Sequence, residues 1–198
     1  MVAPPRLRLV TSNPGKFREI RAIFAAQRLR LGWERRALAE PQADGLEAVV
    51  RSKLAALPSN GTTWVVDDSG LFVAGLAGFP GVYSAYVLRT IGLEGILRLV
   101  RGRRRDAVFR TVAGIRKGAV VRLFRGEIRG RIAARPRGRH GFGYDPIFIP
   151  DGWGRTFGES ALAEKNQVSH RARAMQLAAA YVAGVGARRR KRPPAKER

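Results

Sequence analysis

Residues 64–71 read WVVDDSGL, an apolar run of strand-forming side chains that leads into two adjacent carboxylates and a Ser-Gly pair. The apolar residues do not alternate with polar ones, so the run predicts a short strand over residues 63–68 that is buried on both faces. The Ser-Gly pair predicts a turn directly after Asp68. Two acids at the end of a buried strand must titrate, pair with cations or bind a metal ion, and this stretch is therefore the first candidate for a functional site.

The segments upstream of this run alternate between strand and helix patterns. Alternating basic and apolar residues predict a strand at 6–11, and helical spacing of the apolar residues predicts a helix directly after Lys16. A second short strand is predicted at 30–38. A further helix is predicted to begin at Asp44 as its N-cap and to end before Pro58. This order of elements is typical of an α/β domain.

The downstream segments complete the same kind of domain. In chain order they predict a Gly/Pro-rich loop at 75–81, a helix at 88–100, two or three antiparallel strands within 106–134, a glycine-rich loop at 137–146, a short strand at 147–150, and a last helix from Ser169 as N-cap to Gly184. The loops hold nearly all of the glycine and the least usual polar residues, so we expect function to reside there.

Length and composition predict one compact domain followed by a tail. The chain has 198 residues, 45% of them hydrophobic, and no cysteine, which excludes disulfides, thiolate catalysis and cysteine-ligated zinc. We expect a domain over residues 1–187 and a solvated basic tail over residues 188–198. Neither a signal-peptide pattern nor a membrane-spanning apolar run is present, so the sequence predicts a cytoplasmic protein that does not enter a membrane.

The formal net charge of +23 predicts attraction to polyanions such as RNA, DNA or nucleotides. One alternative is that this arginine-rich composition reflects genome bias or heat adaptation, with the arginines exposed to solvent and without a binding role. Another is that the arginines at 122–139 and the tail make the chain a basic nucleic-acid-binding protein.

The segment TSNPGK at residues 11–16 is a candidate phosphate cradle. Small and polar residues follow a strand there, Gly15 lets the backbone approach a ligand, and the next helix points its free N–H groups at the loop. Lys16 adds a mobile positive charge. The spacing differs from the Walker-type phosphate loop and from the dinucleotide fingerprint. An ordinary strand-to-helix turn with the same residues is the alternative.

The two carboxylates of the opening stretch suit a magnesium site, because Mg²⁺ prefers oxygen ligands and shares its coordination between one or two carboxylates, water and phosphate. Glu40, which precedes Pro41 in a polar loop, is the best remaining acid to complete this site. The alternative is that Asp67 or Asp68 caps a turn or pairs with an arginine.

Two further segments carry candidate base-binding groups. Phe142 and Tyr144 in GFGYDP are aromatic rings on a pliable loop that suit stacking on a nucleobase, or else they fill the core beneath the loop. Lys165, His170 and Arg171, at or just before the last helix, are mostly hydrogen-bond donors and favour a ligand edge made of acceptors, such as a keto oxygen. A lone histidine at a helix start is also common as a structural residue.

The motifs TSNPGK, VVDDSGL, GFPGVYSAYV, GFGYDPIF and EKNQVSHRARA follow one another along nearly the whole chain. In this order they resemble the inosine triphosphate pyrophosphatase family, also called Ham1-like or non-canonical purine nucleotide diphosphatases. The segments AEPQADGLEAVV and YVLRTIGLEGIL are similar to those of archaeal members. The resemblance implies an elongated mixed β-sheet flanked by helices, two lobes with a central cleft, and homodimers.

The resemblance also implies hydrolysis of ITP, dITP or XTP to the monophosphate and pyrophosphate with Mg²⁺ as cofactor. It assigns the proton-accepting role to Asp68 and metal binding to Glu40 and Asp68. The substrate-binding residues that it implies are Thr11, Ser12, Asn13, Pro14, Gly15, Lys16, Lys53, Ser69, Phe142, Gly143, Tyr144, Asp145, Lys165, His170 and Arg171. A Maf-like nucleotide pyrophosphatase, with the same fold and another base specificity, is the rival enzyme.

Overall fold

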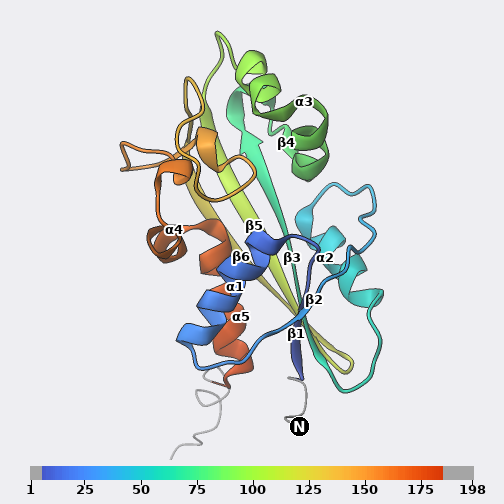
Figure 1. The fold of residues 1–198 in the computed structure, drawn as a ribbon. Helices are drawn as coiled ribbons and strands as arrows, with labels where there is room; N and C mark the ends of the chain where they lie inside the picture. The colour runs from blue at the N-terminus through green and yellow to red at the C-terminus, as the bar shows by residue number, and fades with distance from the viewer. Residues whose placement is uncertain (1–5, 185–198) are drawn as a thin grey trace, which may run out of the picture.

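The computed structural model describes residues 6–184, which form one seven-stranded sheet with helices packed against it (Figure 1). The strands are β1 (Leu7–Val10), β2 (Gly32–Glu34), β3 (Thr63–Val73), β4 (Pro80–Gly81), β5 (Asp106–Lys117), β6 (Val120–Ile132) and β7 (Phe148–Pro150). The α-helices are α1 (Pro14–Ala26), α2 (Leu46–Ala55), α3 (Ser84–Leu99), α4 (Leu162–Val168) and α5 (His170–Val182). Three 3-10 turns are η1 (Ala74–Leu76), η2 (Asp145–Ile147) and η3 (Phe157–Glu159).

The sheet is mixed, and its strand order is β2-β1-β3-β5-β6-β7, with β4 paired to β3. Strand β1 runs parallel to β2 and β3, whereas β3, β5 and β6 are antiparallel neighbours. Strands β3, β5 and β6 are long and run through most of the molecule, as Figure 1 shows. This confirms the expected α/β class with an elongated mixed sheet. No helix within residues 6–184 is long and apolar enough to cross a membrane.

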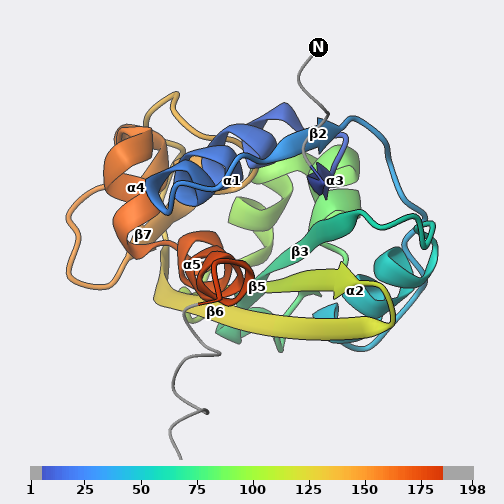
Figure 2. The same cartoon turned by 90° about the horizontal axis from the view of Figure 1, so that it is seen from below.

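Three apolar clusters hold the helices on the sheet. On one face, α1 and α5 cover the half of the sheet near β1, with Phe24 and Met175 fully buried, and α3 covers the other half through Ile96. On the opposite face, α2 packs through Val50 and Leu54 against Trp64, Val66 and Val112. Figure 2, seen from below, shows α1 and α5 beside each other and away from α2. The space between the α1/α5 group and α3 is where the candidate site lies.

The predicted turn after Asp68 is wrong, because β3 continues without interruption to Val73. The reason is tertiary: β5 pairs with β3 along its whole length, including Ser69 with Thr111. Gly70 is therefore a strand residue. A Cβ at this position would lie 2.3 Å from the carbonyl oxygen of Gly81, so the glycine allows the β4 segment to approach the strand closely. The predicted burial on both faces of residues 64–68 is confirmed.

Several other boundaries differ from the sequence prediction. The N-cap of α2 is Gly45 without a side-chain cap bond, and Asp44 lies one residue too early and is exposed. The helix predicted at 88–100 begins at Ser84 and contains a non-helical Gly92 with φ of 65°. The second strand covers only β2, and α4 was not predicted. These differences arise where tertiary contacts, rather than local propensity, decide the ends of an element.

The remaining element predictions are confirmed. Ser169 is the N-cap of α5, and its hydroxyl accepts a hydrogen bond from the N–H of Ala172 at 3.1 Å. The antiparallel ribbon consists of two strands, β5 and β6, and β6 alternates between exposed and buried residues over its second half. The basic tail predicted at 188–198 lies outside the described residues.

Close packing of α5 on β6 gives a first testable prediction. A Cβ on Gly126 would lie 2.2 Å from the carbonyl oxygen of His170 and 2.6 Å from the backbone nitrogen of Ala174. Gly126→Ala is therefore expected to push the start of α5 away from the sheet and to lower the free energy of unfolding by about 1–3 kcal/mol, as overpacking does. Urea unfolding measures this. Gly154→Ala, at an open loop position without a positive φ, controls for the loss of a glycine, and equal stability of Gly126→Ala and wild type would contradict the packing.

Candidate active site

The two adjacent carboxylates lie on an edge of β3 that lacks a neighbouring strand among residues 6–184. Strand β1 pairs with β3 as far as Val65, and β4 pairs with it again from Leu71. Successive strand residues point to opposite faces, so Asp67 and Asp68 point away from each other. Different cations accompany the two side chains, which explains how adjacent buried acids are tolerated.

Asp68 forms one part of a carboxylate pair with Glu40. The Lys53 ammonium group from α2 lies 2.7 Å from Asp68 Oδ1 and 2.7 Å from Glu40 Oε1, so both carboxylates converge on one point of positive charge. Burial raises the pKa of Asp68, and the attraction of Lys53 only partly opposes this shift. Burial alone would lower the pKa of Lys53. The attraction of Asp68 and Glu40 outweighs burial and raises this pKa above its ordinary value, so the lysine stays charged. The side chains of Glu40 and Asp68 therefore share a common space.

Asp67 points to the face of the sheet that carries α1 and α5. Its Oδ2 atom lies 3.2 Å from Lys16 Nζ and 3.1 Å from Arg171 Nε. Burial would raise the pKa of Asp67, but Lys16, Arg171 and Lys53 outweigh it and hold the pKa well below its usual value. The alternative reading, in which one of the two acids pairs with an arginine, is thus correct for Asp67.

A buried chain of charges extends from Asp67 to the glycine-rich loop. Arg171 also pairs with Glu19 on α1, Glu19 pairs with Lys165 at 2.7 Å, and Lys165 pairs with Asp145 in that loop. The side chains of Glu19, Lys165 and Arg171 are each 3% exposed. Burial would raise the pKa of Glu19, but Arg171 and Lys165 lower it overall, so Glu19 is ionised. This series of ion pairs holds α1, α4, α5 and the loop together.

Sequence reasoning missed Glu19. The only available signal was its position three residues after Lys16, next to Ile20 on the predicted buried face of the helix. An acid there is unusual, because a carboxylate is almost never fully buried unless it is paired. The cations that pair with it come from residues about 150 positions away in the chain, which no local pattern reveals.

The predicted phosphate cradle is the start of α1. Asn13 is the N-cap, its Oδ1 accepts from the Lys16 backbone N–H at 3.1 Å, and Thr11 Oγ1 accepts from the Asn13 N–H at 3.1 Å. Pro14 occupies the first helical turn, where the missing N–H is harmless. A Cβ on Gly15 would lie 2.5 Å from the ring of Phe142, so this glycine lets the aromatic ring pack on the helix.

The aromatic residues of the glycine-rich loop have different environments. The ring of Phe142 is partly exposed and lies 5.0 Å from Lys165 Nζ and 5.2 Å from the Arg171 guanidinium carbon. Tyr144 is only 4% exposed, and its hydroxyl donates to the Ser84 carbonyl oxygen at 2.9 Å. Tyr144 therefore mainly fills the core beneath the loop, whereas Phe142 presents its ring to the pocket.

His170 at the start of α5 is stacked on Phe109, with ring centroids 4.5 Å apart and an interplanar angle of 13°. Burial, with a further contribution from Arg171 and Lys165, holds the pKa of His170 well below its ordinary value, so the ring is neutral. Within the described part of the chain its Nδ1 atom is buried without a hydrogen-bond partner. A neutral imidazole keeps one acceptor nitrogen, so the expectation that this residue is mostly a donor is wrong.

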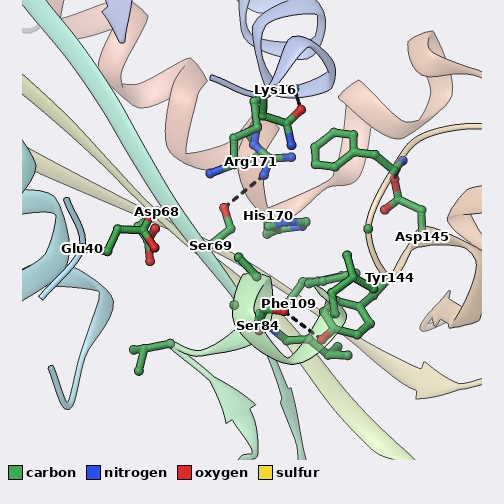
Figure 3. A pocket seen from close by; sticks show the side chains of 18 of the residues that line it. Lys16, Glu40, Asp68, Ser69, Ser84, Phe109, Tyr144, Asp145, His170 and Arg171 are labelled. Atoms are coloured by element: carbon green, nitrogen blue, oxygen red, sulfur yellow. Dashed lines mark hydrogen bonds between the residues drawn. The ribbon is translucent and has the colours of Figure 1, made fainter. Parts of the chain in front are cut away.

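These groups line one pocket between the α1/α5 helices and α3, shown in Figure 3. The predicted residues in its wall are Asn13, Lys16, Glu40, Asp68, Ser69, Phe142, Gly143, Tyr144, Asp145, Lys165, His170 and Arg171. The predicted Thr11, Ser12, Pro14, Gly15 and Lys53 do not line it, although Thr11, Gly15 and Lys53 contact residues that do. Sequence reasoning missed the wall residues Gly70, Leu71, Val82, Ser84, Ala85, Leu88 and Phe109.

Glu40 and Asp68 are the acids of the pocket wall that would contribute ligands to a divalent cation. Within residues 6–184, no group of three or more histidine, aspartate or glutamate side chains is arranged to bind a metal ion alone. Glu40 and Asp68 nevertheless converge on one cationic group, Lys53 Nζ, and both line the pocket. Two carboxylates suit Mg²⁺, which keeps several positions for water and substrate phosphate.

Comparison with known proteins agrees with this geometry. The sequence profile of the Ham1 family matches residues 7–181. The chain is 48% identical over 173 residues to a dITP/XTP pyrophosphatase of Thermococcus kodakarensis, covering 86% of this chain and 94% of that protein. It is 44% identical over 182 residues to a dITP/XTP pyrophosphatase of Pyrobaculum aerophilum, covering 89% and 96% of the two chains.

Solved structures show the same fold. A HAM1 protein from Coxiella burnetii has a TM-score of 0.75 at 26% identity and covers 89% of this chain and 98% of its own. The Ham1 protein of Staphylococcus aureus has a TM-score of 0.74 at 29% identity, covering 90% and 99%. Sequence profile, sequence identity and fold agree over nearly the whole described chain, and the protein belongs to the Ham1 family.

Proposed function

We propose that the protein hydrolyses non-canonical purine nucleoside triphosphates (ITP, dITP and XTP) to the monophosphate and pyrophosphate, and so cleans the nucleotide pool. The observation that carries this proposal is the convergence of Glu40 and Asp68 near the α1 cradle, in a pocket whose wall also carries the hydrogen-bond donors Lys165 and Arg171. The activity for which the relatives are named, dITP/XTP pyrophosphatase, supports the same reaction.

The residues around β3 supply the chemistry. Lys16 and the N-terminus of α1 bind the phosphate groups, since both present positive charge to the pocket. Asp68 accepts a proton from the attacking water, because burial raises its pKa towards the range useful for a general base. Ser69 lies next to it on β3, with its hydroxyl held by Thr111 Oγ1 at 2.7 Å. Glu40 and Asp68 hold Mg²⁺, which when bound neutralises phosphate charge.

Arg171, Lys165 and Phe142, in the pocket wall beside α1, read the base. Arg171 has five N–H donors, of which Asp67, Glu19 and Ser69 each take one, so two remain. Lys165 has three donors, and Glu19 and Asp145 take two of them. These free donors complement the 6-keto oxygen of hypoxanthine or xanthine. Phe142, which partly faces the pocket, stacks on the ring of the base.

Base selectivity is the direct test of this arrangement. Adenine presents an amino donor to the free donors of Lys165 and Arg171, which leaves them unpaired at a cost in the transition state. With Mg²⁺, kcat/KM for ITP and XTP is therefore expected to exceed that for ATP by at least about 100-fold, and GTP, with its 2-amino donor, is expected to be slow as well. Pyrophosphate release across a panel of nucleotides measures this. Equal rates for ITP and ATP would contradict the base-reading role.

Two rival functions give different results in simple assays. A Maf-like pyrophosphatase would prefer pyrimidine or modified nucleotides in the same panel. A nucleic-acid-binding protein would show RNA binding that falls with salt, survives Asp68→Asn and disappears when residues 188–198 are removed. The pocket favours an enzyme over a nucleic-acid binder, because the carboxylate pair, Lys16 and the donors meet in it. The relatives named dITP/XTP pyrophosphatase favour the purine enzyme over a Maf-like one.

Three further expectations accompany the proposal. The family resemblance implies a homodimer, and the exposed aromatic side chains of Phe79, Tyr83 and Tyr86, next to β4 and around the start of α3, offer a surface that association would cover. Light scattering after gel filtration measures the mass of the particle.

Dependence on Mg²⁺ is tested by removing the metal with a chelator. We also propose a cytoplasmic location, which suits an enzyme of the nucleotide pool.

A further inference from the structure

A second hollow lies behind Phe142, on a different side of this ring from α3 and the apolar part of the pocket. It has a volume of about 340 Å³ and is enclosed by the first turns of α1, the loop residues 139–142 and the start of α4. Phe142 and Lys165 belong to the walls of both the pocket and the hollow. The other wall residues of the hollow take no part in the reaction proposed above, apart from Gly15.

The hollow carries positive charge that no nearby acid neutralises. Arg18, Arg139 and His140 line it, and among residues 6–184 none of these side chains has an ion-pair partner. The one acid in its wall is Glu19, which is already paired with Lys165 and Arg171. Positive groups from two separate segments thus face one space without counter-charges.

Three other hollows have two or more arginines in their walls, and each of them also contains at least two acids. On the opposite face of the sheet, a hollow of about 520 Å³ contains Arg110 and Arg125. There Arg110 lies 3.4 Å from Glu127, and Arg125 lies 2.5 Å from Glu47, so both arginines are neutralised. Positive charge alone is therefore common on this protein, whereas the wall of the hollow behind Phe142 combines arginines from two segments with a single acid that is already paired.

We propose that the hollow behind Phe142 is a second anion site, which takes a small phosphate-bearing ligand. Arg18 and Arg139 provide forked donors for phosphate oxygens, and the imidazole of His140 adds a third group. The N-terminus of the 13-residue helix α1 begins at its edge and adds partial positive charge. The ligand touches Phe142 and Lys165 from outside the pocket, so it lies next to the groups that read the base.

Binding measurements without a metal ion and without turnover test this site. Inorganic pyrophosphate is titrated calorimetrically into the full chain at fixed ionic strength, and wild type is expected to bind two pyrophosphate ions, one in the pocket and one in the hollow. The double variant R18Q/R139Q is expected to lose the second ion or to bind it at least about tenfold more weakly, because charge-assisted hydrogen bonds are removed. Its kcat/KM for ITP is expected to stay within about twofold of wild type, since neither arginine lines the pocket.

A matched control and a second probe complete the test. R110Q/R125Q removes the same charge from the neutralised hollow and is expected to keep both pyrophosphate ions. A single binding site in wild type, an unchanged second site in R18Q/R139Q, or an equal loss in R110Q/R125Q would overturn the proposal. Titration with IMP in place of pyrophosphate identifies the source of the phosphate: a second site for IMP alone indicates a nucleotide, and one for pyrophosphate indicates an inorganic anion. Inactivity towards ITP would leave this count of sites unaffected, so the two proposals fail separately.

Discussion

Asp68→Asn is expected to lower the turnover of ITP by about 10³-fold, in the range found when a general base is removed. The asparagine keeps the shape of the side chain and its contact with Lys53, but it cannot accept a proton and binds a divalent cation poorly. Steady-state release of pyrophosphate from ITP in the presence of Mg²⁺ measures the effect on kcat.

The same variant is expected to keep its fold. Lys53 keeps its ion pair with Glu40, and the amide oxygen can still accept from its ammonium group, so the free energy of unfolding is expected to fall less than in Asp67→Asn. Asp106→Asn is a matched control, because Asp106 is an exposed acid paired with Arg104 at the far end of β5, and it is expected to retain full activity. Full activity of Asp68→Asn would show that the base and metal roles are wrongly assigned.

Asp67→Asn is expected to show the opposite behaviour and to lower the free energy of unfolding by about 3 kcal/mol, as breaking a buried ion pair does. Asp67 is fully enclosed, with 1% of its side chain exposed, and it neutralises Lys16 and Arg171. Without it, Arg171 keeps only Glu19 as an ion-pair partner, and Lys16, whose side chain is 19% exposed, keeps none within residues 6–184. Chemical unfolding by guanidinium chloride measures the loss, with Asp68→Asn as the neighbouring control.

The dependence of this loss on pH follows from the direction of the pKa shifts. Asp67 and Glu19 have lowered pKa values in the folded protein, so the unfolded chain binds more protons than the folded chain in acid. Their stabilising contribution is fully present above the unfolded pKa values, near 4, and is lost as the pH falls below roughly 4. Wild type should therefore lose stability more steeply in acid than Asp67→Asn. Equal stability of wild type and Asp67→Asn at neutral pH would contradict the buried network.

Much of the fold followed from local chemistry. The apolar run at 64–68, the Ser169 cap and the ribbon of β5 and β6 were predictable, because buried strands, N-caps and alternating patterns have residue signatures that need no knowledge of the rest of the chain. The predicted turn after Asp68 failed, since Ser69 and Gly70 are turn formers by propensity that pairing with β5 holds in a strand.

The candidate site divides in the same way. Residue type and order alone pointed to Lys16, Glu40 and Asp68 as phosphate and metal groups, and the structure brings all three to one pocket. The sequence could not show that Asp67 and Asp68 serve different ends, although strand alternation makes adjacent residues point apart. That distinction depends on which cations lie on each face of the sheet.

The sequence by itself determined the family, the class of fold and most of the polar residues that meet in the pocket, because these depend on motifs and on periodicity within single segments. Only the tertiary structure decided that Glu19 pairs with Lys165 and Arg171, and that unpaired arginines gather behind Phe142. The physical reason is that a charge is stabilised by its neighbours in space. Those neighbours come from segments up to 152 residues apart, which only folding brings together.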